Sequence, residues 1–275
     1  MRLGVRRLLI RPGAIGDCIV ALPAMEHLRA DFTEVWVPSV VTPLIGFADA
    51  VDAIARTGLD QVGIPCVRPD ARLVARLQGF DDIVSWYGAN RESFQAAVYG
   101  LGLPFRFFPA LPAADGEVHA ADFLMSQVGG TVPATPQLTL RASEQWASER
   151  RRFAAVHPFS GGARKNWPLE RFRALKLDLP IEFTAGPEEK LPEARRFEDL
   201  SELAAWLASA AVYIGNDSGI SHLAAAVGTP TLALFGPTRP EVWAPRGPIV
   251  KVLRDMEAIE VDVVEQAVRD LLAGR

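Results

Sequence analysis

Short apolar runs alternate with longer amphipathic stretches along the whole chain of 275 residues. Short runs rich in β-branched residues predict strands, and apolar positions that repeat with the helical period predict helices. Strands that alternate with helices are typical of βαβ units, which build parallel sheets covered by helices on both faces. We therefore expect an α/β fold. The predicted strands are residues 7–11, 34–37, 83–86, 153–157, 181–184, 212–215 and 231–235, and the predicted helices are residues 17–29, 71–77, 93–99, 118–128, 143–152, 169–175, 203–210, 219–227 and 261–272.

The alternation runs through the chain twice, which predicts two successive doubly wound domains. A segment rich in Gly, Pro and Thr, residues 129–136, separates the two runs and is the best linker candidate. We expect an N-terminal domain at residues 1–140 and a C-terminal domain at residues 141–275, with packing of the last helix back on the first domain left open. In such pairs the ligand binds between the domains, at the carboxyl ends of the strands.

Composition narrows the classes of protein to consider. Apolar residues make up 49% of the chain and charged residues 23%, which is typical of a globular protein with ample core material. The net charge of -4 gives no reason to expect a nucleic-acid partner. The two cysteines, Cys18 and Cys66, make no disulfide framework in a chain of this length, so two reduced thiols in a cytoplasmic protein are expected.

The N-terminal residues decide between a targeting segment and a first strand. The apolar run at residues 8–10 is too short for a signal peptide, and no later run reaches the length of a membrane span. Peripheral contact with the inner membrane stays open, because Arg2, Arg6, Arg7 and Arg11 could meet an anionic lipid surface. Simple solvation of these arginines is the ordinary alternative.

The first candidate loop, residues 11–17, follows the first predicted strand and opens a helix. Gly13 and Gly16 would let the backbone turn tightly and bring its amides close to a bound group. Asp17 would stand at the helix start, where a carboxylate interacts well with the helix dipole. An ordinary helix cap explains Asp17 equally well. A dinucleotide-binding fingerprint is a weaker match, because the G-x-G-x-x-G pattern is incomplete.

The second candidate loop, residues 157–168, has the donors and the cation needed to bind a diphosphate. The hydroxyl of Ser160 and the amides of Gly161 and Gly162 would donate hydrogen bonds, and Lys165 would neutralise charge. The loop is not a Walker A motif, because Gly-Lys-Ser/Thr is missing. A surface loop with solvated cations is the alternative.

The third candidate loop, residues 214–222, runs from a predicted strand into a predicted helix. Gly219 follows Ser218 at a point where backbone would approach a ligand, and the first amides of the helix would form an anion site. His222 lies one turn into the helix, near enough to share that site. The alternatives are that Asp217 and Ser218 only cap the helix, and that His222 is satisfied within the protein.

Other chemistry finds little support in the sequence. No Ser/His/Asp triad is evident, and neither H-E-x-x-H nor C-x-x-C occurs, so no metal site is expected. The histidines are scattered, at His27, His119, His157 and His222. The acidic pair Glu188–Glu189 is interpreted as a solvated loop.

Taken together, the three loops resemble glycosyltransferase family 9, the ADP-heptose:lipopolysaccharide heptosyltransferases. The matching pieces occur in the family's order, and the last stretch is the longest and most specific. These pieces are residues 8–17 with 22–24, then 157–158 with 165–168 and 171–172, then 215–219 with 222–226, 228–230 and 234–238.

The resemblance implies a fold and a set of site residues. The fold is of GT-B type, with two Rossmann-like doubly wound domains facing a cleft, the nucleotide-sugar donor mainly on the C-terminal domain and the acceptor mainly on the N-terminal one. Asp17 matches the catalytic base, and Lys165 matches the lysine that contacts the donor phosphates. The resemblance gives Ser160, Gly161, Lys165, Asp217, Ser218, Gly219 and His222 to donor binding, and Gly13 and Gly16 to the acceptor-side loop.

The activity implied by the resemblance is metal-independent sugar transfer with inversion. The sugar would be a heptose from ADP-heptose, and the acceptor a lipopolysaccharide core or a related lipid-linked or glycan acceptor. Two features depart from the family: the chain is shorter than most members, and Gly161 and Gly162 leave Ser160 as the single hydroxyl before Lys165. The short N-terminal half motivates an alternative, a non-catalytic nucleotide-sugar-binding or assembly protein. A dinucleotide-dependent oxidoreductase is a third, weaker alternative.

Overall fold

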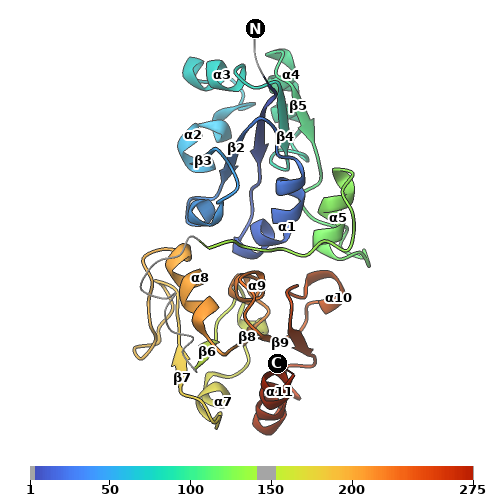
Figure 1. The fold of residues 1–275 in the computed structure, drawn as a ribbon. Helices are drawn as coiled ribbons and strands as arrows, with labels where there is room; N and C mark the ends of the chain where they lie inside the picture. The colour runs from blue at the N-terminus through green and yellow to red at the C-terminus, as the bar shows by residue number, and fades with distance from the viewer. Residues whose placement is uncertain (1–3, 141–152, 275) are drawn as a thin grey trace. The chain divides into compact units, whose positions relative to one another are not determined.

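The computed structural model describes residues 4–140 and 153–274, and the helix predicted at residues 143–152 lies outside them. The chain divides into two compact units, each built around its own sheet (Figure 1). The first unit is Met1–Gly116 with Ala120–Ala134, and the second is Glu117–His119 with Thr135–Arg275.

Within residues 4–140, five parallel strands form the first sheet in the order β3-β2-β1-β4-β5. The central strand β1 lies between β2 and β4, with Leu9 opposite Val35 on one side and Val84 on the other. Its last three residues are fully buried, as expected for the middle of a parallel sheet. The strands are β1 Arg6–Ile10, β2 Phe32–Val37, β3 Ala50–Ala53, β4 Asp82–Ser85 and β5 Phe105–Phe107.

The helices of the first unit connect these parallel strands. Helix α1 continues past Pro23, is largely buried, and lies against α5 (Figure 1). Trp36, Phe94 and Val98 belong to the apolar core of this unit. The elements are α1 Ile15–His27, η1 Ser39–Leu44, α2 Ile54–Thr57, η2 Leu59–Gln61, α3 Ala71–Leu77, α4 Glu92–Gly100 and α5 Ala120–Gln127.

The second sheet, within residues 153–274, contains five parallel strands in the order β10-β9-β8-β6-β7. Strands β8 and β9 are buried along their whole length, and each is mostly apolar, as is typical of a strand covered on both faces. The strands are β6 Ala154–His157, β7 Ile181–Phe183, β8 Val212–Asn216, β9 Thr231–Leu234 and β10 Val250–Leu253.

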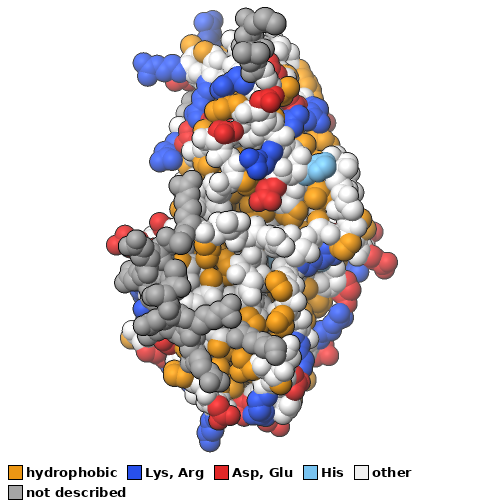
Figure 2. Space-filling view, viewed as in Figure 1, with side chains coloured by type: hydrophobic (Ala, Val, Ile, Leu, Met, Phe, Trp, Pro, Cys, Tyr) orange, Lys and Arg blue, Asp and Glu red, His pale blue; other side chains and the backbone are white. Residues whose placement is uncertain are grey.

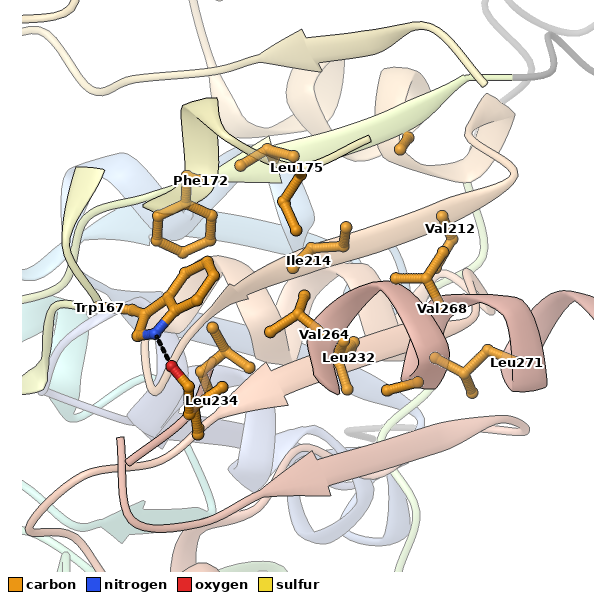
Figure 3. Close-up of a cluster of buried hydrophobic side chains, with 14 of the residues drawn as sticks. Trp167, Phe172, Leu175, Val212, Ile214, Leu232, Leu234, Val264, Val268 and Leu271 are labelled. Atoms are coloured by element: carbon orange, nitrogen blue, oxygen red, sulfur yellow. Dashed lines mark hydrogen bonds between the residues drawn. The ribbon is translucent and has the colours of Figure 1, made fainter. Parts of the chain in front are cut away.

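An apolar core joins α7 and α11 to this second sheet (Figure 3). Trp167 and Phe172 pack edge to face, with ring centroids 4.8 Å apart, and the Trp167 indole donates a 3.0 Å hydrogen bond to the carbonyl of Ile259. Helix α11 buries Val264 and Val268 in the same core. The helices are η3 Ala163–Lys165, α7 Leu169–Arg173, α8 Leu200–Ser209, α9 Gly219–Ala226, α10 Pro240–Trp243 and α11 Val261–Ala273.

Both strand orders are those of doubly wound α/β sheets, so the prediction of two Rossmann-like units is confirmed. The predicted elements in the described residues are present, with small differences at their ends. Three strands were missed, β3, β5 and β10, and each is an edge strand of its sheet. The strand order reverses between β1 and β4 in the first sheet and between β6 and β8 in the second, and such points are where open α/β sheets bind ligands.

The surface has no dominant field of one charge on the face shown in Figure 2, where basic and acidic side chains are interspersed. This agrees with the small net charge of the sequence. Across residues 4–140 and 153–274, no helix has the length and apolar character needed to cross a membrane.

Candidate functional site

The three candidate loops lie at the points where the strand order of each sheet reverses, which we call the switch points of the sheets. Residues 11–14 follow β1 in the first unit. Residues 158–168 follow β6 and residues 217–218 follow β8 in the second unit. Asp17, Gly13 and Gly16 therefore belong to the first unit, and the predicted donor residues belong to the second.

Asp17 is held by the backbone of its own loop. It lies in the first turn of α1, and its Oδ2 accepts a 2.8 Å hydrogen bond from the amide of Ala14. Gly13 has a φ of 122°, and a Cβ at this position would lie 2.8 Å from Asp17 Oδ2. The carboxylate thus closes the helix start from its third residue, as in half of a capping box. The capping role considered from the sequence is present, and it leaves Asp17 Oδ1 without a hydrogen-bond partner among the described residues.

Arg11 is buried, not solvated, and this corrects the interpretation of the N-terminal arginines. Its residue exposure is 1%, so it cannot meet a lipid surface. Its guanidinium donates to the carbonyl of Asp17 through Nε and Nη2, at 3.2 and 2.9 Å, and to the carbonyl of Ala110 through Nη1, at 3.0 Å. Burial also raises the pKa of the neighbouring Cys18 thiol to about 12, so this thiol is protonated at neutral pH.

Arg6 and Arg7, at the other end of β1, make structural contacts. The Arg6 guanidinium lies 3.9 Å from the ring centroid of Phe32. Arg7 pairs with Asp82 at 2.5 Å and donates to the carbonyl of Leu28 at 2.6 Å. Arg2 lies outside the described residues.

Lys165 and Asp217 meet at the switch point of the second sheet. Lys165 Nζ lies 2.7 Å from Asp217 Oδ2, and this contact joins the loop after β6 to the loop after β8. The Asp217 side chain is 7% exposed and the Lys165 side chain 36% exposed. A cation that is held by a buried carboxylate but still reaches solvent is available to an incoming anion.

Asn216 belongs to the family-like stretch at residues 215–219, but its role could not be predicted from the sequence. Its side chain is fully buried and joins two backbone segments of the loop after β6. Its Oδ1 accepts from the amide of Trp167 at 3.0 Å, and its Nδ2 donates to the carbonyl of Pro158 at 2.8 Å. The only sequence signal was an amide side chain between an apolar strand and Asp217, which is also compatible with a turn.

The start of α9 has no side-chain cap. Ser218 is the N-cap residue, yet its hydroxyl makes no capping bond and lies 3.5 Å from the hydroxyl of Ser221. Asp217 pairs with Lys165 instead. The alternative that Asp217 and Ser218 form a capping pair is therefore wrong. The first amides of α9, beginning at Gly219, are left to a ligand or to water.

Gly215 and His222 flank this helix start in the sequence. A Cβ at Gly215 would collide with the hydroxyl of Tyr213, which also receives a 3.2 Å hydrogen bond from Ser221. Burial raises the pKa of Tyr213, so its hydroxyl stays neutral beneath the loop. His222 is buried, with an exposure of 6%.

The glycine loop ahead of Lys165 is open. Ser160 Oγ lies 2.7 Å from Asn166 Oδ1 and 3.0 Å from the carbonyl of Gly162. A Cβ built on Gly161 or Gly162 would meet nothing within 4 Å. The backbone of this loop is therefore accessible, as a phosphate-binding loop requires.

His157 and Glu189 form a further contact at the carboxyl edge of the second sheet, although Glu189 was interpreted as solvated. Glu189 Oε2 lies 3.1 Å from His157 Nε2 and accepts from the amide of Gly186 at 2.6 Å. Burial favours a higher pKa for Glu189, but the hydrogen bonds from His157 and Gly186 outweigh burial and hold the pKa below its ordinary value. His157 Nδ1 is buried and has no partner among the described residues.

Two further observations bear on ligands. A hollow of about 830 Å³ lies beside η3, and its lining includes Arg164, Asn166, Arg171 and Met256. Within residues 4–140 and 153–274, no three His, Cys, Asp or Glu residues are grouped so as to hold a metal ion.

Sequence comparison finds a family likeness in the C-terminal part of the chain. The sequence model of glycosyltransferase family 9 (heptosyltransferase) matches residues 198–270. The resemblance to glycosyltransferase family 9 is confirmed. Lipooligosaccharide heptosyltransferase 2 of Haemophilus influenzae is 37% identical over 59 residues, which are 22% of this chain and 17% of that protein. The sequence match to this family member therefore spans less than a fifth of its length.

Solved structures extend the likeness in fold to nearly the whole chain. A family 9 glycosyltransferase from Veillonella parvula superposes with a TM-score of 0.76 at 17% identity, over 98% of each chain. The E. coli heptosyltransferase WaaC with ADP superposes with a TM-score of 0.65 at 17% identity, over 97% of this chain and 99% of that one. At these identities the likeness shows the fold, and the predicted GT-B type of two Rossmann-like domains is confirmed.

Proposed function

We propose that the chain is a glycosyltransferase that moves a heptose from ADP-heptose to a lipopolysaccharide-core or related glycan acceptor, with inversion at the anomeric carbon. The observation that carries the proposal is the Lys165–Asp217 pair beside the uncapped start of α9. These groups lie at the switch point of a sheet whose family assignment rests on residues 198–270.

The donor diphosphate binds, in this proposal, between Lys165 and the first amides of α9. An anion at a helix N-terminus gains from the free amides and from the helix dipole. Lys165 reaches the phosphates by leaving Asp217 Oδ2, to which it donates in the ligand-free chain. Ser160 and Gly161 supply further donors, and Ser218 and His222 complete the donor set. The same groups stabilise the charge that develops on the departing ADP.

Asp17 is the proposed general base. The acceptor hydroxyl oxygen attacks the anomeric carbon, the bond from that carbon to the phosphate oxygen breaks, and the hydroxyl proton passes to Asp17. The geometry of the loop supports this role, because Asp17 Oδ2 is occupied by the amide of Ala14 while Oδ1 accepts no hydrogen bond from a described residue. Gly13 and Gly16 have no side chains that would block an acceptor hydroxyl from approaching this loop.

Metal independence and location are parts of the same proposal. Lys165 and the helix start replace a divalent cation as the source of positive charge, so transfer should proceed at an unchanged rate in excess EDTA. The two unpaired thiols, Cys18 and Cys66, support a cytoplasmic location. Peripheral contact with the inner membrane would bring the chain to a lipid-linked acceptor.

The deciding experiment is a transfer assay preceded by a nucleotide-sugar screen. A ligand that binds only the folded protein raises its apparent stability, so ADP-heptose should raise the melting temperature, and UDP- or GDP-sugars should do so much less. ADP-heptose should then be consumed only in the presence of a heptose-free core glycan. Stabilisation by ADP-heptose without transfer to any core glycan would support the non-catalytic binding protein instead. The absence of any nucleotide-sugar response would contradict both.

A further inference from the structure

Arg11 is the most deeply buried charged side chain of the first unit, and no carboxylate accepts from it. A charge is costly to bury unless hydrogen bonds compensate it. The described residues give it three hydrogen bonds, and all of them go to backbone carbonyls, those of Asp17 and Ala110. Arg11 therefore acts as a clamp between two backbone segments, at Asp17 and at Ala110, the second of which lies 99 positions from Arg11 along the chain.

One end of this clamp is the residue proposed as the base. Arg11 holds the carbonyl of Asp17, and the amide of Ala14 holds its Oδ2. The backbone and the carboxylate of Asp17 are thus fixed independently. A shift of about 1 Å in a catalytic group is enough to cost about a hundredfold in rate, so the clamp has a catalytic consequence.

The other end of the clamp is the loop after β5, residues 108–111. A second side chain also holds this loop: Gln127 donates to the carbonyl of Pro109 at 3.0 Å and accepts from the indole of Trp86 at 3.0 Å. The loops after β1, β4 and β5 are therefore braced to one another at the carboxyl edge of the first sheet.

We propose that Arg11 is a positioning residue, which fixes the Asp17 carboxylate for proton transfer by tying its backbone to residues 108–111. The inference rests on the proposed function, because it assumes that Asp17 is the base. Arg11 touches neither substrate in this proposal and acts only through Asp17.

The chain offers a matched control in Arg7, on the same strand. Arg7 donates to the carbonyl of Leu28, at the opposite end of α1, and its side chain is 21% exposed. Arg7→Met and Arg11→Met therefore each remove one arginine clamp from the same helix. Only Arg11→Met releases the end that carries Asp17.

The test compares kcat, the KM for ADP-heptose and amide hydrogen exchange in both variants, at a temperature where each is folded. We expect Arg11→Met to lower kcat by about ten- to a hundredfold, with KM for the donor within about twofold of wild type. Arg7→Met should leave kcat within about twofold. Exchange of the Cys18 and Ile19 amides should speed up in Arg11→Met and not in Arg7→Met.

Arg11→Lys tests whether the geometry of the guanidinium or only its positive charge is needed. Lysine keeps the positive charge but cannot reach both carbonyls with a planar fork, so it should restore only part of kcat. Full restoration by Arg11→Lys, or equal loss of kcat in the two methionine variants, would overturn the proposal. Normal kcat in Arg11→Met overturns it while leaving the proposed function intact, whereas absence of transfer in the wild-type chain removes both.

Discussion

The two units begin equivalent helices in opposite ways. Helices α1 and α9 each follow a strand at the switch point of its sheet, and each has a glycine in its first turn, Gly16 or Gly219. The start of α1 is closed by the Asp17 carboxylate, which accepts from the amide of Ala14. The start of α9 is uncapped, because Ser218 makes no capping bond and Asp217 is paired with Lys165.

This difference divides the chemistry between the units. A helix start that carries its own carboxylate repels a further anion and presents a negative group to an incoming hydroxyl. A helix start with free amides and a nearby cation attracts a diphosphate. In the function that we propose, one supersecondary motif therefore supports both a base and an anion site, and the position of one carboxylate determines which of them it forms.

The largest effect should come from Asp17→Asn. Asparagine keeps an oxygen that can accept from the amide of Ala14, so the helix stays capped, but it cannot take a proton. We expect transfer to fall by about a hundred- to ten-thousandfold, with the melting temperature and the dissociation constant for ADP-heptose nearly unchanged. Steady-state kinetics and calorimetric titration measure these quantities. Near-normal turnover would remove Asp17 from the role of base.

Lys165→Ala should have the next largest effect, on binding. It removes a charge-assisted contact to the donor phosphates and leaves the buried Asp217 unpaired, so affinity for ADP should fall by about ten- to a hundredfold. Lys176→Ala is the control, because Lys176 is an exposed lysine of the second unit that belongs to none of the loops of this site. Equal ADP affinity in the two variants would count against Lys165.

A smaller effect should follow from closing the open helix start. Ser218→Asp places a carboxylate where it can accept from the first amides of α9, and a new cap contributes about 1 kcal/mol of stability. The melting temperature should rise by about 2–4 °C while ADP binds several-fold more weakly, because the carboxylate competes with the phosphates. Ser218→Ala is the control for loss of the hydroxyl alone. Unchanged ADP affinity in Ser218→Asp would show that the anion binds elsewhere.

The smallest expected effect concerns pH and the loop after β7. The pKa of Glu189 is lowered in the folded chain, so its contribution to stability is present above the ordinary glutamate pKa and is lost as the pH falls through the folded-state pKa. Glu189→Gln should therefore lower the melting temperature at pH 7, and the difference from wild type should shrink toward pH 3. A difference that is independent of pH would mean that the His157–Glu189 contact does not favour the ionised carboxyl.

The sequence predicted the central strands and the chemical loops because their signals are local. Strands β1, β8 and β9 are mostly apolar at the positions that are buried, and the loops after them combine glycines with charged or hydroxyl side chains. The edge strands β3, β5 and β10 gave no such signal. Each has three or four residues and partly exposed positions, so its pattern resembles that of a loop.

The contacts that organise the site were not predictable, because their partners are distant in the sequence. Arg11 looked like one of several solvated arginines, and its burial depends on a carbonyl at Ala110. The pairing of Asp217 with Lys165 rather than with its own helix likewise joins two loops. Local patterns show which side chains a loop contains, but they do not show which backbone group each side chain will meet.

Asn216 has a consequence for the order in which the molecule folds. Its two hydrogen bonds span 58 and 49 positions, and β8, which carries it, lies between β6 and β9 in the sheet. A nascent chain that ends before residue 212 already contains Lys165 and its loop. It still lacks the Asn216 side chain that holds this loop. Contacts of such long range form late, since the intervening segment must first close. The edge that we propose for the nucleotide sugar is therefore among the last parts of the second unit to assemble.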